Sequence, residues 1–297
     1  MDYQPVSVRD LPPGYLEWPA PAGLRHAVRC LWAQVIPDGG GDRTTLVLPD
    51  ACADLVWEQG RGAFVAGPDT GPVPTVAKAG TALVGVRFRT PAGGPALGVP
   101  LSELRDQRVD LADLHRREAR RLPGTLDPDI AMARAIGLAA TLVADGAPDP
   151  AAARATALLA DPRARAEDVA AEVGLSMRQL RRRCHAVVGY GPKTLQRVLR
   201  FRRFVSRIDA GPPSGQDRHD LALLAVQAGY ADQAHLTREC QDLAGLTPAA
   251  LARQRGPAAL GQAVPHHGGQ LADRVDAVLL GRVPGAQHGH QVVPPAA

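Results

Sequence analysis

Several features that would place a protein in a familiar class are missing from this sequence. No apolar run reaches the roughly 18–20 residues that a helix needs to span a bilayer, so we expect no transmembrane segment and no membrane partner. Residues 1–10 are polar and hold no apolar signal core, which predicts a cytoplasmic rather than an exported protein. The four cysteines form no close pair, so a disulfide scaffold is not indicated.

Enzyme motifs are missing as well. The 297 residues contain no recognisable Ser–His–Asp arrangement, phosphate-binding loop or dinucleotide-binding fingerprint. We therefore expect a protein that is not an enzyme, with no catalytic residues, no bound metal and no cofactor.

Lysine is scarce, and this scarcity shapes the positive charge. Lys78 and Lys193 are the only lysines among 34 basic residues, so nearly all positive charge is arginine. A GC-rich genome would produce the same bias, but arginine also suits bidentate contacts to phosphate and guanine. Residues 1–150 carry 15 basic and 18 acidic side chains, whereas residues 151–256 carry 17 and 10. A basic segment beside a mildly acidic one favours nucleic-acid binding, with a solvated arginine-rich surface as the alternative.

The N-terminal half has a β-rich texture. Residues 1–23 are rich in proline and predict an irregular lead-in. Short β-type runs separated by Gly and Pro follow at 28–32, 44–48, 54–57, 64–66 and 83–88. Evenly spaced short strands predict a small antiparallel β-barrel or sandwich. Helices are expected to accompany it at 91–97, 111–121 and 128–143.

The chain is expected to be α+β, with two domains and a tail. We predict a β-rich sensor or dimerisation domain over 1–145 and a linker at 144–148. Asp149 followed by Pro150 is typical of a helix start and opens an all-α domain over 149–255. Residues 256–297 are rich in Gly, Pro, Gln and His, which predicts a flexible tail with one short helix at 271–280.

The strongest signal is an internal repeat in the basic segment. Leu180, Arg182, Cys184, Gly189 and Pro192 recur, each 56 positions later, as Leu236, Arg238, Cys240, Gly245 and Pro248. Each unit is expected to be a helix, a turn containing glycine, and a second helix. Gly174 and Gly229 end the first helices, and Ser176 with Gln179 forms a capping box that starts the next one. This is the helix-turn-helix pattern.

The second helix of each unit is expected to present one face outward. With Leu180 as the inward direction, Cys184 and Val187 fall on the buried side of the first. Its outward positions are Arg178, Arg181, Arg182 and His185. The matching positions in the second unit are Ala234, Thr237, Arg238 and Gln241. Three arginines on one face favour insertion into a DNA major groove, and predict that the first unit carries more of the affinity.

A helix from about 191 to 208 is expected to join the two units. At 1.5 Å per residue it would be roughly 25 Å long, which suits two recognition helices about one DNA turn apart. It carries five arginines, each a candidate for phosphate contact or for pairing with the scaffold: Arg197, Arg200, Arg202, Arg203 and Arg207.

This pattern closely resembles the arabinose-operon-regulator (AraC-type) family of bacterial transcription factors over residues 150–255. The matching residues of the first unit are Ala170, Gly174, Ser176, Leu180, Arg182, Gly189 and Pro192. Those of the second are Ala225, Gly229, Tyr230, Leu236, Arg238, Gly245, Thr247 and Pro248. Cys184 and Cys240 depart from it, because the family usually has Phe there, which predicts looser cores. The 209–220 loop is also longer than usual.

The resemblance implies contact with double-stranded DNA through the recognition helices. The full predicted set is Ser176, Arg178, Gln179, Arg181, Arg182, His185, Gln233, Ala234, Thr237, Arg238 and Gln241. Residues 48–56 and 85–89 resemble, more weakly, the sensor domains of some family members, which implies a small-molecule effector or a homodimer. RNA polymerase is a further expected partner. Two alternatives stay open: an enzyme or covalent cysteine sensor in 1–145, and an adaptor that docks through the 128–143 helix.

Other candidate sites in the N-terminal half have simpler explanations beside them. Trp32, Trp57 and Arg87 are candidates to line a pocket for a small anionic or aromatic ligand, although each Trp alone suits core packing. Asp50, Cys52 and Asp54 would share one face of a strand, as a metal site, a carboxylate pair or a simple strand start. Cys30 with Cys52 could form a redox pair or stay inert. His266, His267, His288 and His290 could bind a metal, but histidines in a low-complexity tail need no such role.

Overall fold

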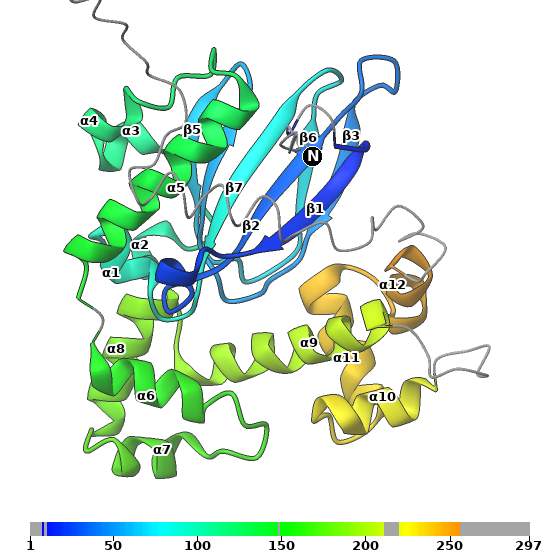
Figure 1. The fold of residues 1–297 in the computed structure, drawn as a ribbon. Helices are drawn as coiled ribbons and strands as arrows, with labels where there is room; N and C mark the ends of the chain where they lie inside the picture. The colour runs from blue at the N-terminus through cyan, green and yellow to red at the C-terminus, as the bar shows by residue number, and fades with distance from the viewer. Residues whose placement is uncertain (1–7, 9–10, 148, 211–219, 256–297) are drawn as a thin grey trace, which may run out of the picture.

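A six-stranded antiparallel sheet forms the centre of the N-terminal domain (Figure 1). In the computed structural model, which describes residue 8 and residues 11–147, 149–210 and 220–255, the strand order is β1-β2-β7-β4-β5-β8. Their bounds are β1 Gly14–Pro19, β2 Val28–Val35, β4 Asp54–Glu58, β5 Gly62–Ala66, β7 Ala82–Phe88 and β8 Arg108–Asp110. Strands β3 (Arg43–Val47) and β6 (Val73–Ala77) pair separately. The large sheet does not close on itself, so the domain is a sandwich rather than a barrel.

All five expected β-runs are strands, and three further strands were not expected. Strand β1 lies in the 1–23 segment, for which an irregular lead-in was predicted; that prediction was wrong. As an edge strand β1 tolerates Pro19, because half of its backbone groups need no ladder partner. Strand β6 contains Pro74, and β8 is only three residues long. In neither segment do apolar and polar residues alternate clearly along the sequence.

The two faces of the sheet pack against different layers. One face carries Trp57, Val84 and Phe88 and packs against helix α5 (Pro128–Asp145), which lies across it in Figure 1. The other face carries Trp32 and the side chains that pack with β6: Ile36, Val56, Phe64 and Leu83. This division follows from the two-residue alternation of side chains along each strand.

Four short helices and one 3-10 turn complete the N-terminal domain beside the sheet and α5. They are α1 (Gly93–Leu97), α2 (Leu101–Leu104), α3 (Leu111–Leu114) and α4 (Arg116–Ala119), with a 3-10 turn at Ala22–Leu24. Of these, α2 was not expected from the sequence. Among the described residues, no single helix is long and apolar enough to cross a membrane. Only α5 and α6 together pass that test, with a 112° bend between them.

The C-terminal domain is helical and has its own core. Its helices are α6 (Pro150–Leu158), α7 (Ala166–Glu172), α8 (Met177–Val188), α9 (Pro192–Ala210), α10 (Leu221–Ala228), α11 (Gln233–Ala244) and α12 (Pro248–Arg255). Asp149 caps α6 by accepting from the backbone N–H groups of Ala151 and Ala152, as expected. Most of the 209–220 loop, the predicted tail, its helix at 271–280 and its histidines lie outside the described residues.

The two domains dock directly on each other. Helices α1 and α2 pack against α8, and two glycines allow the backbones to approach closely. A Cβ at Gly94 would lie 2.7 Å from the carbonyl oxygen of Ala186, and one at Gly189 would lie 3.0 Å from that of Leu101. Ala51, from the β3–β4 connection, is buried in the core of the C-terminal domain. The N-terminal domain therefore contacts both α8 and the core of the C-terminal domain.

Candidate nucleic-acid interface

The turn of the first unit is built as its sequence predicts. Gly174 adopts φ +68°, which favours glycine, and lets the chain reverse after α7. Ser176 Oγ then accepts from the N–H of Gln179 at 3.2 Å, while Gln179 Oε1 accepts from the N–H of Ser176 at 2.8 Å. Both hydrogen bonds of the predicted capping box are present. They fix where α8 begins and hence which of its side chains face outward.

The second unit repeats this arrangement with a different cap. Gly229 has φ +95°, and Asp232 accepts from the N–H of His235 at 2.7 Å to start α11. Cys184 and Cys240 are both fully buried, at the matching positions of the two recognition helices. Phe201 and Phe204 of α9 are also fully buried and supply aromatic side chains to the same core.

The outward face of α8 is exposed and strongly basic. Arg178, Arg181 and Arg182 are exposed, and their side chains make no hydrogen bond or ion pair to any described residue. His185 is partly buried; burial, then the charges of Arg105 and Arg181, lower its pKa. A cavity of about 690 Å³ lies on this face, lined by the arginines and also by Gln179, His185, Ala186, Pro100 and Ser102. Like charges this close, with no carboxylate among them, are suited to an anion.

The outward face of α11 is exposed but nearly neutral. Gln233, Ala234, Arg238 and Gln241 are exposed, and Thr237 is partly buried with its hydroxyl donating to the carbonyl of Gln233 at 2.9 Å. Within the described residues, the Arg238 side chain has no partner. The two recognition helices thus present the eleven predicted side chains on their outward or N-terminal positions, with three unpartnered arginines on one and one on the other.

Most other arginines of the domain are bound by the scaffold, whereas Arg163, Arg165 and Arg253 have no side-chain partner among the described residues. Arg183 of α8 binds both carboxylate oxygens of Asp149, at 2.6 and 2.7 Å. Four of the five arginines of α9 donate to protein groups: Arg197 to Glu239 and Asp242, Arg202 to Asp50, Arg203 to Ala160 and Ala228, and Arg207 to Gln227. The fifth, Arg200, lies over the Tyr230 ring, and its buried Nε has no hydrogen-bond partner among the described residues. Of the two roles considered for the α9 arginines, these contacts favour the scaffold.

Comparison with known proteins agrees with this geometry. Residues 169–254 match the family described as "Helix-turn-helix domain". This segment is a helix-turn-helix domain of the AraC type. It makes the chain a DNA-binding transcription regulator, and the match covers both recognition helices. Residues 16–110 match a second family, described as "Domain of unknown function (DUF6597)". A search of curated proteins found no match to this chain.

Solved structures of ToxT from Vibrio cholerae are similar to the chain at low identity. The 1.65 Å structure shares 11% identity, with a TM-score of 0.40, and the match covers 72% of this chain and 98% of that one. ToxT with a bound unsaturated fatty acid shares 10% identity, with a TM-score of 0.37, covering 80% and 93%. Likeness at this level assigns neither ligand nor activity to this chain.

Outside the AraC-type domain, the three candidate ligand residues do not meet in one place. Trp57 is fully buried against α5, and its Nε1 donates to the carbonyl of Pro123 at 2.9 Å. Trp32 and Arg87 lie on the opposite face of the sheet. The prediction that all three line one pocket was therefore wrong for Trp57, because sequence alone did not fix which face of β4 points toward α5.

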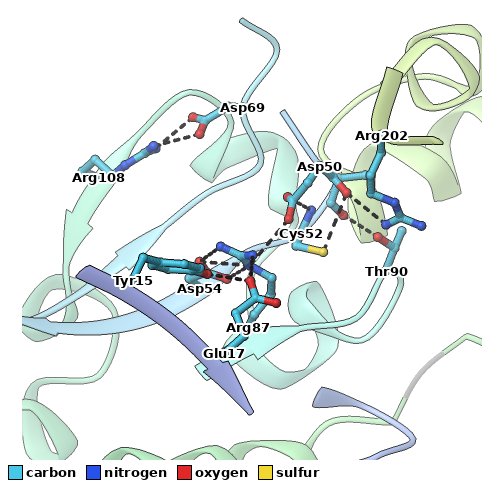
Figure 2. Close-up of polar contacts among 11 residues, drawn as sticks. Tyr15, Glu17, Asp50, Cys52, Asp54, Asp69, Arg87, Thr90, Arg108 and Arg202 are labelled. Atoms are coloured by element: carbon cyan, nitrogen blue, oxygen red, sulfur yellow. Dashed lines mark hydrogen bonds and ion pairs between the residues drawn. The ribbon is translucent and has the colours of Figure 1, made fainter. Parts of the chain in front are cut away.

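Arg87 is already surrounded by carboxylates (Figure 2). Its guanidinium donates to both oxygens of Asp54, at 3.0 Å to the nearer atoms, and pairs with Glu17 at 3.2 Å and Asp50 at 3.5 Å. Tyr15 lies beside it and donates to Glu17 at 2.6 Å. Three carboxylates more than balance one guanidinium, so Arg87 is not available to an anionic ligand.

Asp50, Cys52 and Asp54 were expected to share one face of a strand, but they do not lie in one strand. Only Asp54 lies in β4; Asp50 instead accepts from the N–H of Cys52 at 2.9 Å across Ala51, which has φ +65°. The Ala51 carbonyl accepts from Thr90 Oγ1 and the Asp50 carbonyl from Arg202 (Figure 2). The described residues contain no group of three His, Cys, Asp or Glu side chains that could hold a metal. This turn fastens the two domains together.

The four cysteines are buried and unpaired, and their thiols should be unreactive. Burial raises the pKa of Cys52 and Cys240 to about 12 and that of Cys184 to about 11, and raises the pKa of Cys30 as well. The thiolate is the reactive form, so we expect only slow alkylation by iodoacetamide at neutral pH and full labelling after unfolding in urea. Intact-mass spectrometry would count the labels. Fast labelling of the folded chain at Cys52 would revive the covalent-sensor alternative.

Proposed function

We propose that α8 and α11 enter two successive major grooves on one face of a DNA duplex and read its sequence. The observation that carries this proposal is the contrast among arginines: four of the five in α9 donate to the scaffold, while Arg178, Arg181, Arg182 and Arg238 have no partner among the described residues. The 19 residues of α9 give a strut of roughly 28 Å, comparable with one DNA turn. Arginine on an exposed recognition helix suits both guanine edges and phosphates.

The same proposal gives the N-terminal domain a regulatory part. We place the boundary between the domains at 145–149, between α5 and α6. The N-terminal domain would sense a small molecule or form a homodimer, and pass the change through α1, α2 and the Asp50 turn to α8 and α9. Trp32 supports a ligand on its face of the sheet, since its Nε1 is buried without a hydrogen-bond partner among the described residues. The carboxylates around Arg87 favour an uncharged or aromatic ligand over an anionic one.

Salt dependence tests the arginine assignment. Each phosphate that the chain neutralises adds about −0.9 to the slope of log affinity against log salt. The probe is a duplex that the full-length chain selects from a random pool. With about six phosphate contacts, the affinity for this duplex should fall roughly a thousandfold between 50 and 200 mM salt. Fluorescence anisotropy at several salt concentrations gives the slope. Affinity that stayed nearly constant would contradict the assignment.

Genome-wide mapping of the DNA that the chain binds tests the proposed regulatory role. Discrete sites in front of genes are the expected result, with loss of those sites in an Arg178→Ala/Arg182→Ala chain. Uniform binding along the chromosome would instead indicate a DNA-coating protein. The neighbouring genes would also suggest the class of effector.

A further inference from the structure

The N-terminal domain borders the basic face of α8. Pro100 and Ser102, at the start of α2, line the same 690 Å³ cavity as Arg178, Arg181 and Arg182 of α8. Close approach of the backbones at Gly94 and Gly189 holds α1 and α2 against the helix, so this border is part of the docked structure. Any duplex that reaches the outward side chains of α8 must pass beside α2.

One basic side chain of the N-terminal domain points to this border. Arg105 follows α2 directly, and its Nη1 lies 3.5 Å from the carbonyl oxygen of Gly189, the residue that ends α8. Its charge reaches the outward face of the helix, because it contributes to lowering the pKa of His185 there. The carboxylate in reach is that of Asp106, at 3.9 Å, and it already accepts from the N–H and hydroxyl of Thr70. Arg105 is therefore exposed and weakly paired.

We propose that Arg105 contacts the phosphate backbone of the duplex that α8 reads, so that the DNA-binding surface spans both domains. The inference rests on the proposed function. Helix α8 has 12 residues and is roughly 18 Å long, whereas a major groove is about 12 Å wide. A helix lying in the groove therefore brings its end close to a flanking strand, where a guanidinium beside Gly189 meets a phosphate. Such a contact positions the protein without reading sequence.

The test compares Arg105→Gln with the unchanged full-length chain. The probes are two duplexes of about 30 base pairs: one selected by the unchanged chain, and one with the same bases scrambled. Loss of one phosphate contact should reduce the magnitude of the salt slope by about 1 and weaken binding roughly fivefold at physiological salt. The factor should be similar for both duplexes, since a phosphate contact carries no sequence information.

Two further variants keep the test decisive. Arg61→Gln is the matched control, because the Arg61 side chain is 42% exposed, as is that of Arg105, but pairs with Asp110 beside the β4–β5 turn; it should bind as the unchanged chain does. Asp106→Asn removes the carboxylate next to Arg105 and should tighten binding. Asn suits its φ of +58° and can still accept from Thr70.

The outcomes separate this inference from the proposed function. If Arg105→Gln and Asp106→Asn keep the original slope and affinity while Arg182→Ala weakens binding, α2 does not touch DNA and the inference is overturned. Tighter binding by Arg105→Gln would also overturn it, because α2 would then obstruct the duplex. If Arg182→Ala has no effect either, the proposed function itself fails.

Discussion

Replacing Arg178 and Arg182 together with alanine should weaken binding of the full-length chain to its selected duplex at least roughly thirtyfold. Each good arginine–base pair contributes about 1–3 kcal/mol, so two lost pairs correspond to about 2–6 kcal/mol. Both side chains are exposed and have no partner among the described residues, so nothing in the fold depends on them. Stability should therefore stay unchanged, and the loss can be assigned to DNA contact. Titration by anisotropy, with a melting curve for each variant, provides the measurement.

The comparison variant replaces two neutral side chains of α11 instead. Thr237→Ala and Gln241→Ala stand at the positions equivalent to Arg181 and His185 but remove no charge. We expect this pair to cost less affinity and to leave the salt slope unchanged, because neutral side chains displace no counterions. Equal losses from the two double variants would contradict the prediction that the first unit carries more of the affinity.

The AraC-type domain was predictable because its signals are local. Gly174 and Gly229 end helices through their own backbone geometry, and the capping pair Ser176 and Gln179 lies within one turn of chain. Because the unit occurs twice, each copy independently indicates the same helices and the same turn. Side chains on α8 could be divided into inward and outward sets, since one buried residue, Leu180, fixes the phase of a regular helix.

The N-terminal domain was less predictable because its arrangement depends on distant partners. Five strands could be found, but no local signal fixed that Trp57 packs on α5 while Trp32 faces β6. The approach of α2 to α8 was equally hidden: α2 has four residues, and its place depends on the contact of Gly94 with Ala186 across the domains. For the same reason Arg105 gave no sign of its position.

Replacing Arg87 with leucine should destabilise the N-terminal domain by about 3–5 kcal/mol, the usual cost of leaving a buried charge without its partner. The Asp54 side chain is only 13% exposed, and its carboxylate would lose both hydrogen bonds to the guanidinium. All three tryptophans of the chain lie in this domain, at positions 18, 32 and 57. Urea unfolding followed by tryptophan fluorescence therefore reports on this domain rather than on the helices.

The pH dependence of that loss identifies Asp54 as its cause. Burial, the largest influence, raises the pKa of Asp54, and Arg87 is the main group that opposes it. The folded state then binds more protons than the unfolded state between the two pKa values, so Asp54 favours folding at low pH and loses that contribution as pH rises. Without Arg87 the folded pKa rises further. The deficit of Arg87→Leu should thus shrink as pH falls from 7 toward 5.

A double variant completes the argument. In Arg87→Leu/Asp54→Asn the buried carboxylate at position 54 is gone, so most of the lost stability should return at pH 7 and the remaining deficit should no longer depend on pH in this range. Asp54→Asn alone should cost less than Arg87→Leu, because Arg87 keeps Glu17 and Asp50 as partners. A deficit of Arg87→Leu that is the same at pH 5 and pH 7, with no recovery in the double variant, would show that packing around Arg87, rather than the charge of Asp54, holds this part of the sheet together.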